Sequence, residues 1–330
     1  MTAAGALPLA VSVGDPAGVG PELIAAAWER REGLVPFFVC GGAGILAAAG
    51  AKVVAIADPA EASAAFAHGL PVLAGEDTHY TPGLPDRDGA EVALASLAQA
   101  VELARVGKAA GVVTSPVSKA LIAAIDPGCI GQTEFCADAC ARPRADAVML
   151  LAGPQLRVVP LTVHVALADV PRLITHELIL QRCRIVARAM AEDFGIAAPR
   201  IALTGLNPHA GEAGRMGHEE IEEIAPAIAQ LRSEGIDATG PHPADTLFAP
   251  HLRTTYDVAI AMYHDQALAP LKALDFDQGV NMTIGLPIIR TSPDHGTAFG
   301  IAGKGTASAS AVIAAIRMAG EVAARRRALG

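Results

Sequence analysis

The sequence predicts an α/β protein, and three observations lead to this prediction. Short apolar runs alternate with alanine-rich or amphipathic segments through most of the chain, which is the rhythm of parallel strands joined by helices. Aromatic residues make up only 4% of the composition, so small side chains let helices pack closely on sheets. The chain has 330 residues, of which 52% are hydrophobic, and this is enough for two domains with separate cores.

The elements are predicted in chain order from these runs. Strands are expected near Pro8–Val13, Phe37–Cys40, Val53–Ala57 and Gly111–Thr114, and helices near Pro21–Glu32, Ala90–Val106 and Lys119–Ala124. Helices are also expected near Leu178–Phe194, Glu219–Glu234 and Ala307–Leu329, with three apolar strands among them. No repeat or linker separates the two halves, so the chain is expected to cross between its domains more than once. A cleft between the domains is the expected site.

Composition and charge exclude several function classes. The net charge is −9, and the one basic run, Arg325–Arg327, lies at the C-terminus, which argues against a nucleic-acid partner. The N-terminus lacks the positive start of a secretory signal, and no stretch reaches the length of a membrane span. Five cysteines without a CxxC pair are typical of reduced thiols, and for Cys136 and Cys140 buried packing is favoured over metal binding. We therefore expect a cytoplasmic protein without a membrane partner.

Three histidines follow apolar runs that are expected to be buried strands. His164 follows Val158–Val163, His209 follows Ile201–Leu206, and His264 follows Val258–Met262. Ligands of open α/β sheets bind at the carboxyl ends of strands, and three neutral imidazoles leave metal coordination positions open. A single histidine in such a place is more often a hydrogen-bonded residue at a loop edge. From the pattern alone, both interpretations stay open.

Two further segments have both a structural and a ligand-binding interpretation. Val13–Glu22 reads VGDPAGVGPE, a strand, turn and helix start that could hold an anion, although its glycine spacing fits no dinucleotide fingerprint. In GQTEF, Gln132 and Thr133 could hydrogen-bond a substrate, while Thr133 with Glu134 could equally cap a helix. Without context the structural interpretation is favoured for both segments.

The last third of the chain is the richest in polar residues. Lys272 lies in APLKALDF, and Arg290 closes the strand-like run IGLPIIR. Partial burial of these cations would demand an anionic partner, and a phosphate or carboxylate substrate can be that anion. The glycine-rich segment Arg290–Ser308 could approach a nucleotide or be a mobile loop.

In this order, seven motifs closely resemble the 4-hydroxythreonine-4-phosphate dehydrogenase (PdxA) family. They are GDPAGVGPE, TSPVSKA with GQTEF, LNPHAGE, PADTLF, AMYHDQ, GVNMTIGLPIIRTSPDHGTA and AGKGTAS. The resemblance implies a fold like that of isocitrate and isopropylmalate dehydrogenases, with two interwoven α/β/α domains and a cleft between them. We place one domain at residues 1–135 plus 290–330 and the other, with the histidines, at 136–289. The resemblance also implies a homodimer with active sites at the interface.

The resemblance also implies cofactors and site residues. The cofactors are NAD or NADP and a divalent metal, which could be zinc, magnesium, cobalt or manganese. By motif, the metal ligands are His164, His209 and His264, and the substrate-binding residues are Gln132, Thr133, Lys272, Asn281 and Arg290. Coenzyme contacts are expected at Asp294, His295 and Gly296, while Asp245 and Asp265 are expected to orient ligand histidines or relay a proton.

The implied activity is oxidation of a phosphorylated hydroxy acid, 4-hydroxythreonine 4-phosphate, followed by decarboxylation to 3-amino-2-oxopropyl phosphate in pyridoxal phosphate biosynthesis. Gln132 departs from the family, which usually has histidine there, and glutamine cannot become cationic near neutral pH. A four-carbon sugar-acid phosphate or a cis-dihydrodiol carboxylate is therefore an alternative substrate. A metal-dependent hydrolase or lyase, or a non-catalytic sugar-phosphate binding protein, is the alternative from another class.

Overall fold

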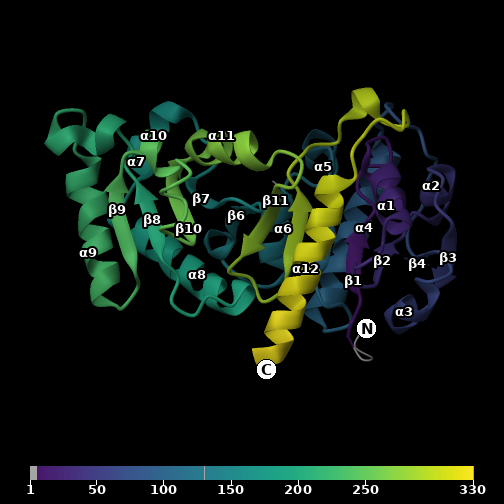
Figure 1. The fold of residues 1–330 in the computed structure, drawn as a ribbon. Coiled ribbons are helices and arrows are strands. Elements are labelled where there is room, and N and C mark those ends of the chain that lie inside the picture. The colour runs from purple at the N-terminus through teal and green to yellow at the C-terminus, as the bar shows by residue number, and fades with distance from the viewer. Residues whose placement is uncertain (1–5, 130, 330) are drawn as a thin grey trace. The chain divides into compact units, whose positions relative to one another are not determined.

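A computed structural model describes residues 6–129 and 131–329 of the chain (Figure 1). Of the described residues, those in Met1–Ala147 and Val280–Ala324 form one compact unit, and those in Val148–Gly279 and Arg325–Gly330 form a second. The domain boundaries expected from the sequence stay a prediction. None of the described helices is long and apolar enough to cross a membrane.

The first unit alternates strands with helices. Its strands are β1 (Leu9–Ser12), β2 (Phe37–Cys40), β3 (Val53–Ile56), β4 (Leu70–Leu73), β5 (Val112–Thr114), β11 (Val280–Ile284) and β12 (Arg290–Pro293). Its helices are α1 (Gly20–Glu29), α2 (Ala43–Ala48), α3 (Ala62–Ala65), α4 (Arg87–Arg105), α5 (Lys119–Ile125), α6 (Gln132–Ala139) and α12, which begins at Ser310 and ends at Leu329. The strand order is β3-β4-β2-β1-β5-β12-β11, parallel except for the antiparallel pair β11–β12.

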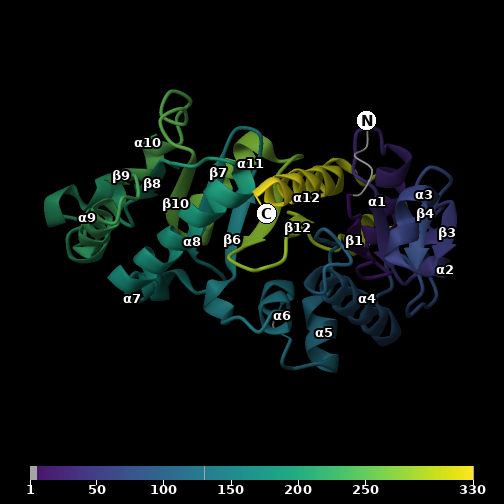
Figure 2. The ribbon, with the colours of Figure 1, turned by 90° about the horizontal axis from the view of Figure 1, so that it is seen from below.

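Small and aliphatic side chains fill the interior of the first unit, as its composition predicts. Helix α4 starts at an Asp86 cap, whose side chain accepts from the Gly89 N–H, and it packs on β1 and β2. It also contacts α5 and α6, which lie beside it in Figure 2. The buried cluster beneath includes Phe38 and Leu97 together with Cys136, and Cys140 packs against its edge. Packing is therefore what the structure shows for these two cysteines.

The second unit contains five strands. Its strands are β6 (Val148–Ala152), β7 (Arg157–Thr162), β8 (Ile201–Thr204), β9 (Ala238–His242) and β10 (Val258–Tyr263). Its helices are α7 (Val170–Leu173), α8 (His176–Phe194), α9 (Ala225–Ser233), α10 (Ala244–Leu247) and α11 (His264–Asp275). The strand order is β6-β7-β10-β8-β9, and β7, β10, β8 and β9 are parallel. Helix α11 packs on β7 and β10.

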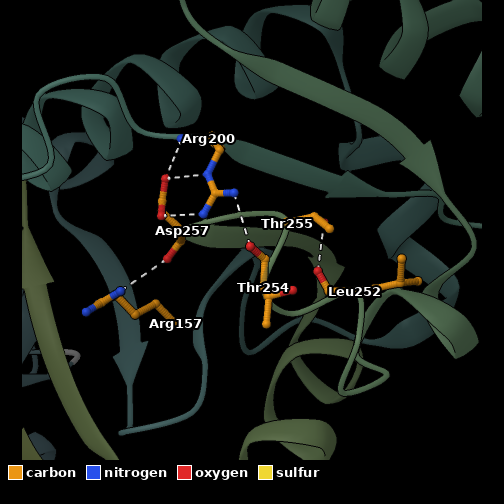
Figure 3. A network of polar contacts seen from close by, with 6 residues as sticks. All are labelled: Arg157, Arg200, Leu252, Thr254, Thr255 and Asp257. Atoms are coloured by element: carbon orange, nitrogen blue, oxygen red, sulfur yellow. Dashed lines mark hydrogen bonds and ion pairs between the residues drawn. The ribbon is translucent and has the colours of Figure 1, made fainter.

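A polar network joins the amino ends of three strands in the second unit (Figure 3). Asp257, just before β10, accepts from the backbone N–H of Arg200 and from its guanidinium Nε and Nη2, at 2.9, 3.1 and 2.9 Å. The Arg200 Nη1 donates to the Thr254 carbonyl at 3.1 Å, and the Arg157 Nη1 to the Asp257 carbonyl at 3.3 Å. The bidentate geometry is the strong form of this ion pair.

The expected helices and strands are confirmed in type, with small shifts at their ends. One interpretation is wrong: Arg290 does not close a strand. Between Ile284, which ends β11, and Arg290, the run IGLPIIR forms no strand, because Gly285 adopts a φ of +85° and Pro287 has no N–H to donate to a sheet. Strand β12 instead begins at Arg290 and pairs antiparallel with β11. The sequence pattern also missed β4, β6, β9 and β11.

Candidate active site

Two of the expected histidines lie together at the carboxyl ends of neighbouring strands in the second unit. Strands β7 and β10 are parallel neighbours in which Tyr263 pairs with Thr162, so the residues that follow them emerge side by side. His164 follows β7 in a left-handed conformation with a φ of +51°, and His264 is the first residue of α11. Their ring centroids are 5.8 Å apart.

Neighbouring groups orient His264. Its Nδ1 lies 2.7 Å from Oδ1 of the exposed Asp265, a bond that leaves Nε2 as the nitrogen that can take a ligand. Gln266 holds the strand ends beneath it. Its Oε1 accepts from the Met262 N–H and the Thr204 hydroxyl, both at 2.7 Å, and its Nε2 donates to the Gly205 carbonyl at 2.9 Å. The end of β8 is thereby tied to the start of α11.

The third histidine lies in a strained turn after β8. Six consecutive residues, His209–Gly214, have positive φ values of 52, 51, 77, 42, 56 and 88°. Only two of the six are glycines, and each other residue in this conformation costs about 1–2 kcal/mol. Such strain persists where the surroundings impose it, often at functional sites.

The histidine pair fits a shared metal ion, but one chain does not assemble the full set. Two imidazoles bound at ~2.0–2.1 Å through one nitrogen each, at a tetrahedral angle, would place their ring centroids about 5 Å apart, and the observed 5.8 Å is close to this separation. Among the described residues, however, no group of three or more His, Cys, Asp or Glu side chains lies close enough to hold a metal. Within one chain, His209 therefore does not complete the set with His164 and His264.

The first unit contains a buried cation that is held by neutral groups. Arg290 is 3% exposed. Its Nε and Nη2 donate to the Thr114 hydroxyl at 3.1 and 2.7 Å, its Nη1 donates to the Thr283 hydroxyl at 3.1 Å, and its Nη2 also donates to the Gln132 Oε1 at 2.8 Å. Burial lowers the pKa of Arg290, and the nearby Cys136 and Glu134 act in the opposite direction. A buried cation with neutral acceptors favours an anionic ligand nearby.

Gln132 contacts protein groups on both sides of its amide. Its Nε2 donates to the Ser115 carbonyl at 3.0 Å, which assigns Oε1 to the side that faces Arg290. Glutamine here thus extends the shell of neutral acceptors around the guanidinium without adding a charge. Helix α6 begins at Gln132 with Gly131 as its N-cap, and no side-chain cap is formed. The capping interpretation of Thr133 is therefore wrong, and Thr133 is half-buried in the first turn.

The other expected substrate residues differ in burial. Asn281, on β11, has a buried Oδ1 with no hydrogen-bond partner among the described residues. This oxygen could accept a hydrogen bond from a ligand. Lys272 is exposed on α11, so its environment does not demand an anion. Asp245 is exposed in the first turn of α10. Of the two carboxylates expected to assist the histidines, Asp265 is the one that bonds to His264.

The loop expected to contact the coenzyme is open. His295 and Gly296 are exposed, Asp294 is half-buried, and a Cβ added at Gly296 would meet no atom within 4 Å. Around Gly296, therefore, no protein atom occupies the space that a side chain would take.

The turn after β1, in contrast, is closed. The N–H groups of Ala17 and Gly18 donate to the Asp15 side chain and carbonyl, both at 3.0 Å, and the Val19 N–H donates to the Thr297 carbonyl at 2.9 Å. Burial raises the pKa of Asp15. Because these N–H groups are already paired, the structure favours a connection over an anion site here.

Sequence reasoning missed Glu220, which contacts the entry to the histidine turn, and did not assign Gln266 its part. Glu220 is 3% exposed and accepts from the N–H groups of Leu206 and Asn207. It lies in the acidic stretch HEEIEE, which reads as a solvated helix face. The only available signal was its proximity in sequence to LNPHAGE.

Comparisons with known proteins identify the class and then the family. The fold and the histidine pair define a mixed α/β enzyme, and the relatives named below are dehydrogenases. A family described as "Pyridoxal phosphate biosynthetic protein PdxA" matches residues 35–319, and the chain belongs to this family.

Relatives and solved structures match nearly the whole chain. The 4-hydroxythreonine-4-phosphate dehydrogenase of Erythrobacter litoralis is 58% identical and that of Zymomonas mobilis 51%, each match covering 97% of both chains. A crystal structure of this dehydrogenase from Klebsiella pneumoniae has a TM-score of 0.86 at 36% identity, covering 97% of this chain and 99% of that one. A terephthalate 1,2-cis-dihydrodiol dehydrogenase from Burkholderia xenovorans has a TM-score of 0.65 at 27% identity, covering 96% and 98%. The expected α/β fold is confirmed.

Proposed function

We propose that this protein is a metal- and NAD(P)-dependent dehydrogenase that oxidises 4-hydroxythreonine 4-phosphate, in pyridoxal phosphate biosynthesis in the cytoplasm. The observation that carries the proposal is the 58% identity, over 97% of both chains, with the 4-hydroxythreonine-4-phosphate dehydrogenase of Erythrobacter litoralis. The paired rings of His164 and His264 support it from the structure, because imidazoles are common ligands of zinc and cobalt.

Each group of residues has a part in the proposed mechanism. His164, His264 and His209 would hold the metal, and Asp265 keeps the His264 Nε2 free by its bond to Nδ1. When bound, the metal polarises the substrate hydroxyl as a Lewis acid and the nicotinamide accepts hydride. Arg290 would neutralise an anionic end of the substrate, and Asn281 would orient it through the buried Oδ1.

Other residues have less support in the structure. Thr133 and Lys272 are proposed to contact the substrate, and Asp294, His295 and Gly296 to contact the coenzyme, as the family motifs imply. We also keep Asp245 as a proposed proton relay. Gln132 is proposed to act on the substrate through Arg290, since both sides of its amide contact protein groups. Zinc, magnesium, cobalt and manganese are all candidates for the metal.

The proposed assembly is a homodimer with the active site at its interface. Five apolar side chains of the second unit are each 40–67% exposed: Val165, Leu167, Leu173, Met216 and Ile221. Val165, Leu167 and Leu173 lie shortly before His176 in the sequence, and Ile221 lies shortly before Glu223. The backbone N–H of His176 donates to the Glu223 carboxylate, so these two exposed segments are joined. Association would remove this apolar surface from water. We further propose that a second copy of the chain supplies the third imidazole, because His209 does not join the pair within one chain.

A cis-dihydrodiol carboxylate is the second candidate substrate. The match to a terephthalate cis-dihydrodiol dehydrogenase favours it, as does the neutral Gln132 beside Arg290, because a carboxylate needs less positive charge than a phosphate.

A substrate panel tests the activity. Purified protein is offered 4-hydroxythreonine 4-phosphate, four-carbon sugar-acid phosphates and cis-dihydrodiol carboxylates with NAD or NADP, and absorbance of the reduced nicotinamide is followed. We expect the phosphorylated hydroxythreonine to give the highest kcat/KM, chelation to abolish turnover, and one of zinc, cobalt, magnesium or manganese to restore it. No reduced nicotinamide with any of these substrates would rule out the dehydrogenase and leave a hydrolase or lyase.

Subunit complementation tests the shared metal set. His209→Ala and His164→Asn are each expected to be inactive as pure proteins. If His209 comes from the partner, mixed dimers hold one intact site, so an equal mixture refolded together should recover about a quarter of wild-type activity. A mixture as inactive as its components would show that all three histidines of a site belong to one chain.

A further inference from the structure

We propose that Glu220 is a positioning residue that presents His209 for metal binding, an inference that rests on the proposed function. The Glu220 Oε1 accepts from the backbone N–H groups of Leu206 and Asn207, both at 2.8 Å, and Oε2 accepts from the Asn207 side-chain Nδ2 at 3.0 Å. The carboxylate is thus bound to the two residues where the chain leaves β8 and enters the histidine turn.

The chain closes around this carboxylate because glycines allow it. A Cβ added at Gly211 would lie 2.6 Å from the Glu220 Oε2, and one at Gly205 would lie 3.0 Å from Oε1 and 2.8 Å from the Ala210 Cα. No larger residue fits at either position without moving the carboxylate or the turn. Glu220 therefore lies inside the loop and is surrounded by the backbone on both sides of His209.

The hydrogen bonds that Glu220 accepts also explain how the strained turn keeps one conformation. His209 begins the run of six left-handed residues, which would relax to other conformations if its entry were free. The Ala210 N–H bonds only locally, to the Asn207 carbonyl. The Asn207 Nδ2 is shared with Glu219, which accepts from it at 2.7 Å, but only Glu220 among the described side chains holds the backbone N–H groups of both Leu206 and Asn207. Glu220 therefore sets the direction in which the chain reaches His209.

A structural role in the helix alone does not require this arrangement. Glu220 is the first residue of the π-helical segment Glu220–Ile224, where an acidic side chain could remain in solvent, as that of Glu222 does. The Glu220 side chain is instead buried, and each group that donates to it is a neutral N–H. Charge-assisted bonds of this kind are about twice as strong as neutral ones.

Cobalt binding to the full-length protein tests the proposal. Glu220→Gln keeps the size of the side chain but removes the charge and presents an N–H₂ to one of the three donors. We expect its Co²⁺ dissociation constant to rise about 10- to 100-fold, with a changed visible absorption band of the bound ion, and kcat to recover at saturating Co²⁺. The matched control Glu222→Gln makes the same charge change on an exposed neighbour and should bind Co²⁺ within about twofold of wild type.

The outcomes separate this inference from the proposed function. Equal Co²⁺ affinity in Glu220→Gln and Glu222→Gln would overturn the positioning role. If the wild-type protein binds no Co²⁺, or if His209→Ala binds it as tightly as wild type, the metal assignment of His209 fails instead, and the role of Glu220 with it. If Glu220→Gln does not unfold cooperatively, Asn207→Ala carries the test, because it leaves the carboxylate in place and removes the Nδ2 group that donates to Glu220 and also to Glu219. An unchanged Co²⁺ affinity in that variant also overturns the proposal.

Discussion

The two ends of the sheet in the second unit differ in what holds them. At the amino ends of β7, β8 and β10, Arg157, Arg200 and Asp257 form a network of charged and backbone groups (Figure 3). At the carboxyl ends of the same strands, the chain turns into His164, His209 and His264, two of which have a positive φ. One end thus joins opposite charges in relaxed geometry, and the other keeps strained backbone and titratable rings.

This difference teaches how stability and function are divided along the strands. Bonds at the amino ends fix the strand register, and substrate-sized ligands are not expected there. Two side chains hold the strained carboxyl ends in place. Gln266 accepts from a backbone N–H at the end of β10, and the Glu220 carboxylate accepts from two backbone N–H groups in the loop after β8. Substitutions at the two ends should therefore affect different measurements.

The largest effect is expected for His164→Asn. Asparagine tolerates the positive φ of this position, so the change removes the imidazole without adding backbone strain. We expect kcat/KM to fall by about 10³-fold or more, because several kcal/mol of transition-state stabilisation depend on the metal. The free energy of unfolding, measured in urea, should stay within about 0.5 kcal/mol of wild type, since the side chain is exposed. Equal losses of stability and activity would contradict the division between the two ends.

A smaller effect, on stability instead of activity, is expected for Asp257→Asn. The amide loses the charge that accepts three N–H groups of Arg200, and the side chain is only 20% exposed. We expect the free energy of unfolding to fall by about 1–3 kcal/mol at pH 7, while kcat/KM stays near the wild-type value. Glu91→Gln, in an exposed helix pair with Arg87, is the control and should leave stability unchanged.

The pH dependence of that difference sharpens the comparison. Hydrogen bonds from Arg200 lower the pKa of Asp257 below its ordinary value. A lowered pKa contributes stability that is fully present above the unfolded pKa of about 3.9 and is lost as pH falls through the folded pKa. The gap between wild type and Asp257→Asn should thus be constant from neutral pH to about pH 5 and shrink below pH 4. A gap that stays constant to pH 2 would show that Asp257 contributes by shape and not by charge.

Much of the fold could be predicted from the sequence because its signals are local. The apolar runs before His164 and His264 form β7 and β10, and the alanine-rich segments form α4 and α12. The motifs also predicted the family, since long blocks such as GVNMTIGLPIIRTSPDHGTA are specific. The strand assigned to IGLPIIR was wrong because apolar content outweighed the glycine and proline within it.

Contacts between distant residues could not be predicted in the same way. Arg290 is 176 residues from Thr114 and 158 from Gln132, and no periodicity indicates that neutral groups surround a buried cation. Glu220 resembles a solvated acidic residue until the turn closes around it. Gln266 was noted beside His264, but its bonds to Thr204 and Gly205 depend on the order of strands in the sheet.

By itself, the sequence determined the α/β class, the family and the residues that follow each strand, because hydrophobic periodicity and motif identity are properties of neighbouring residues. Only the tertiary structure decided that His164 and His264 face one another, that Arg290 is buried among neutral groups, and that Glu220 holds the turn of His209. These facts depend on strand order and burial, which arise when distant segments pack together and exclude water.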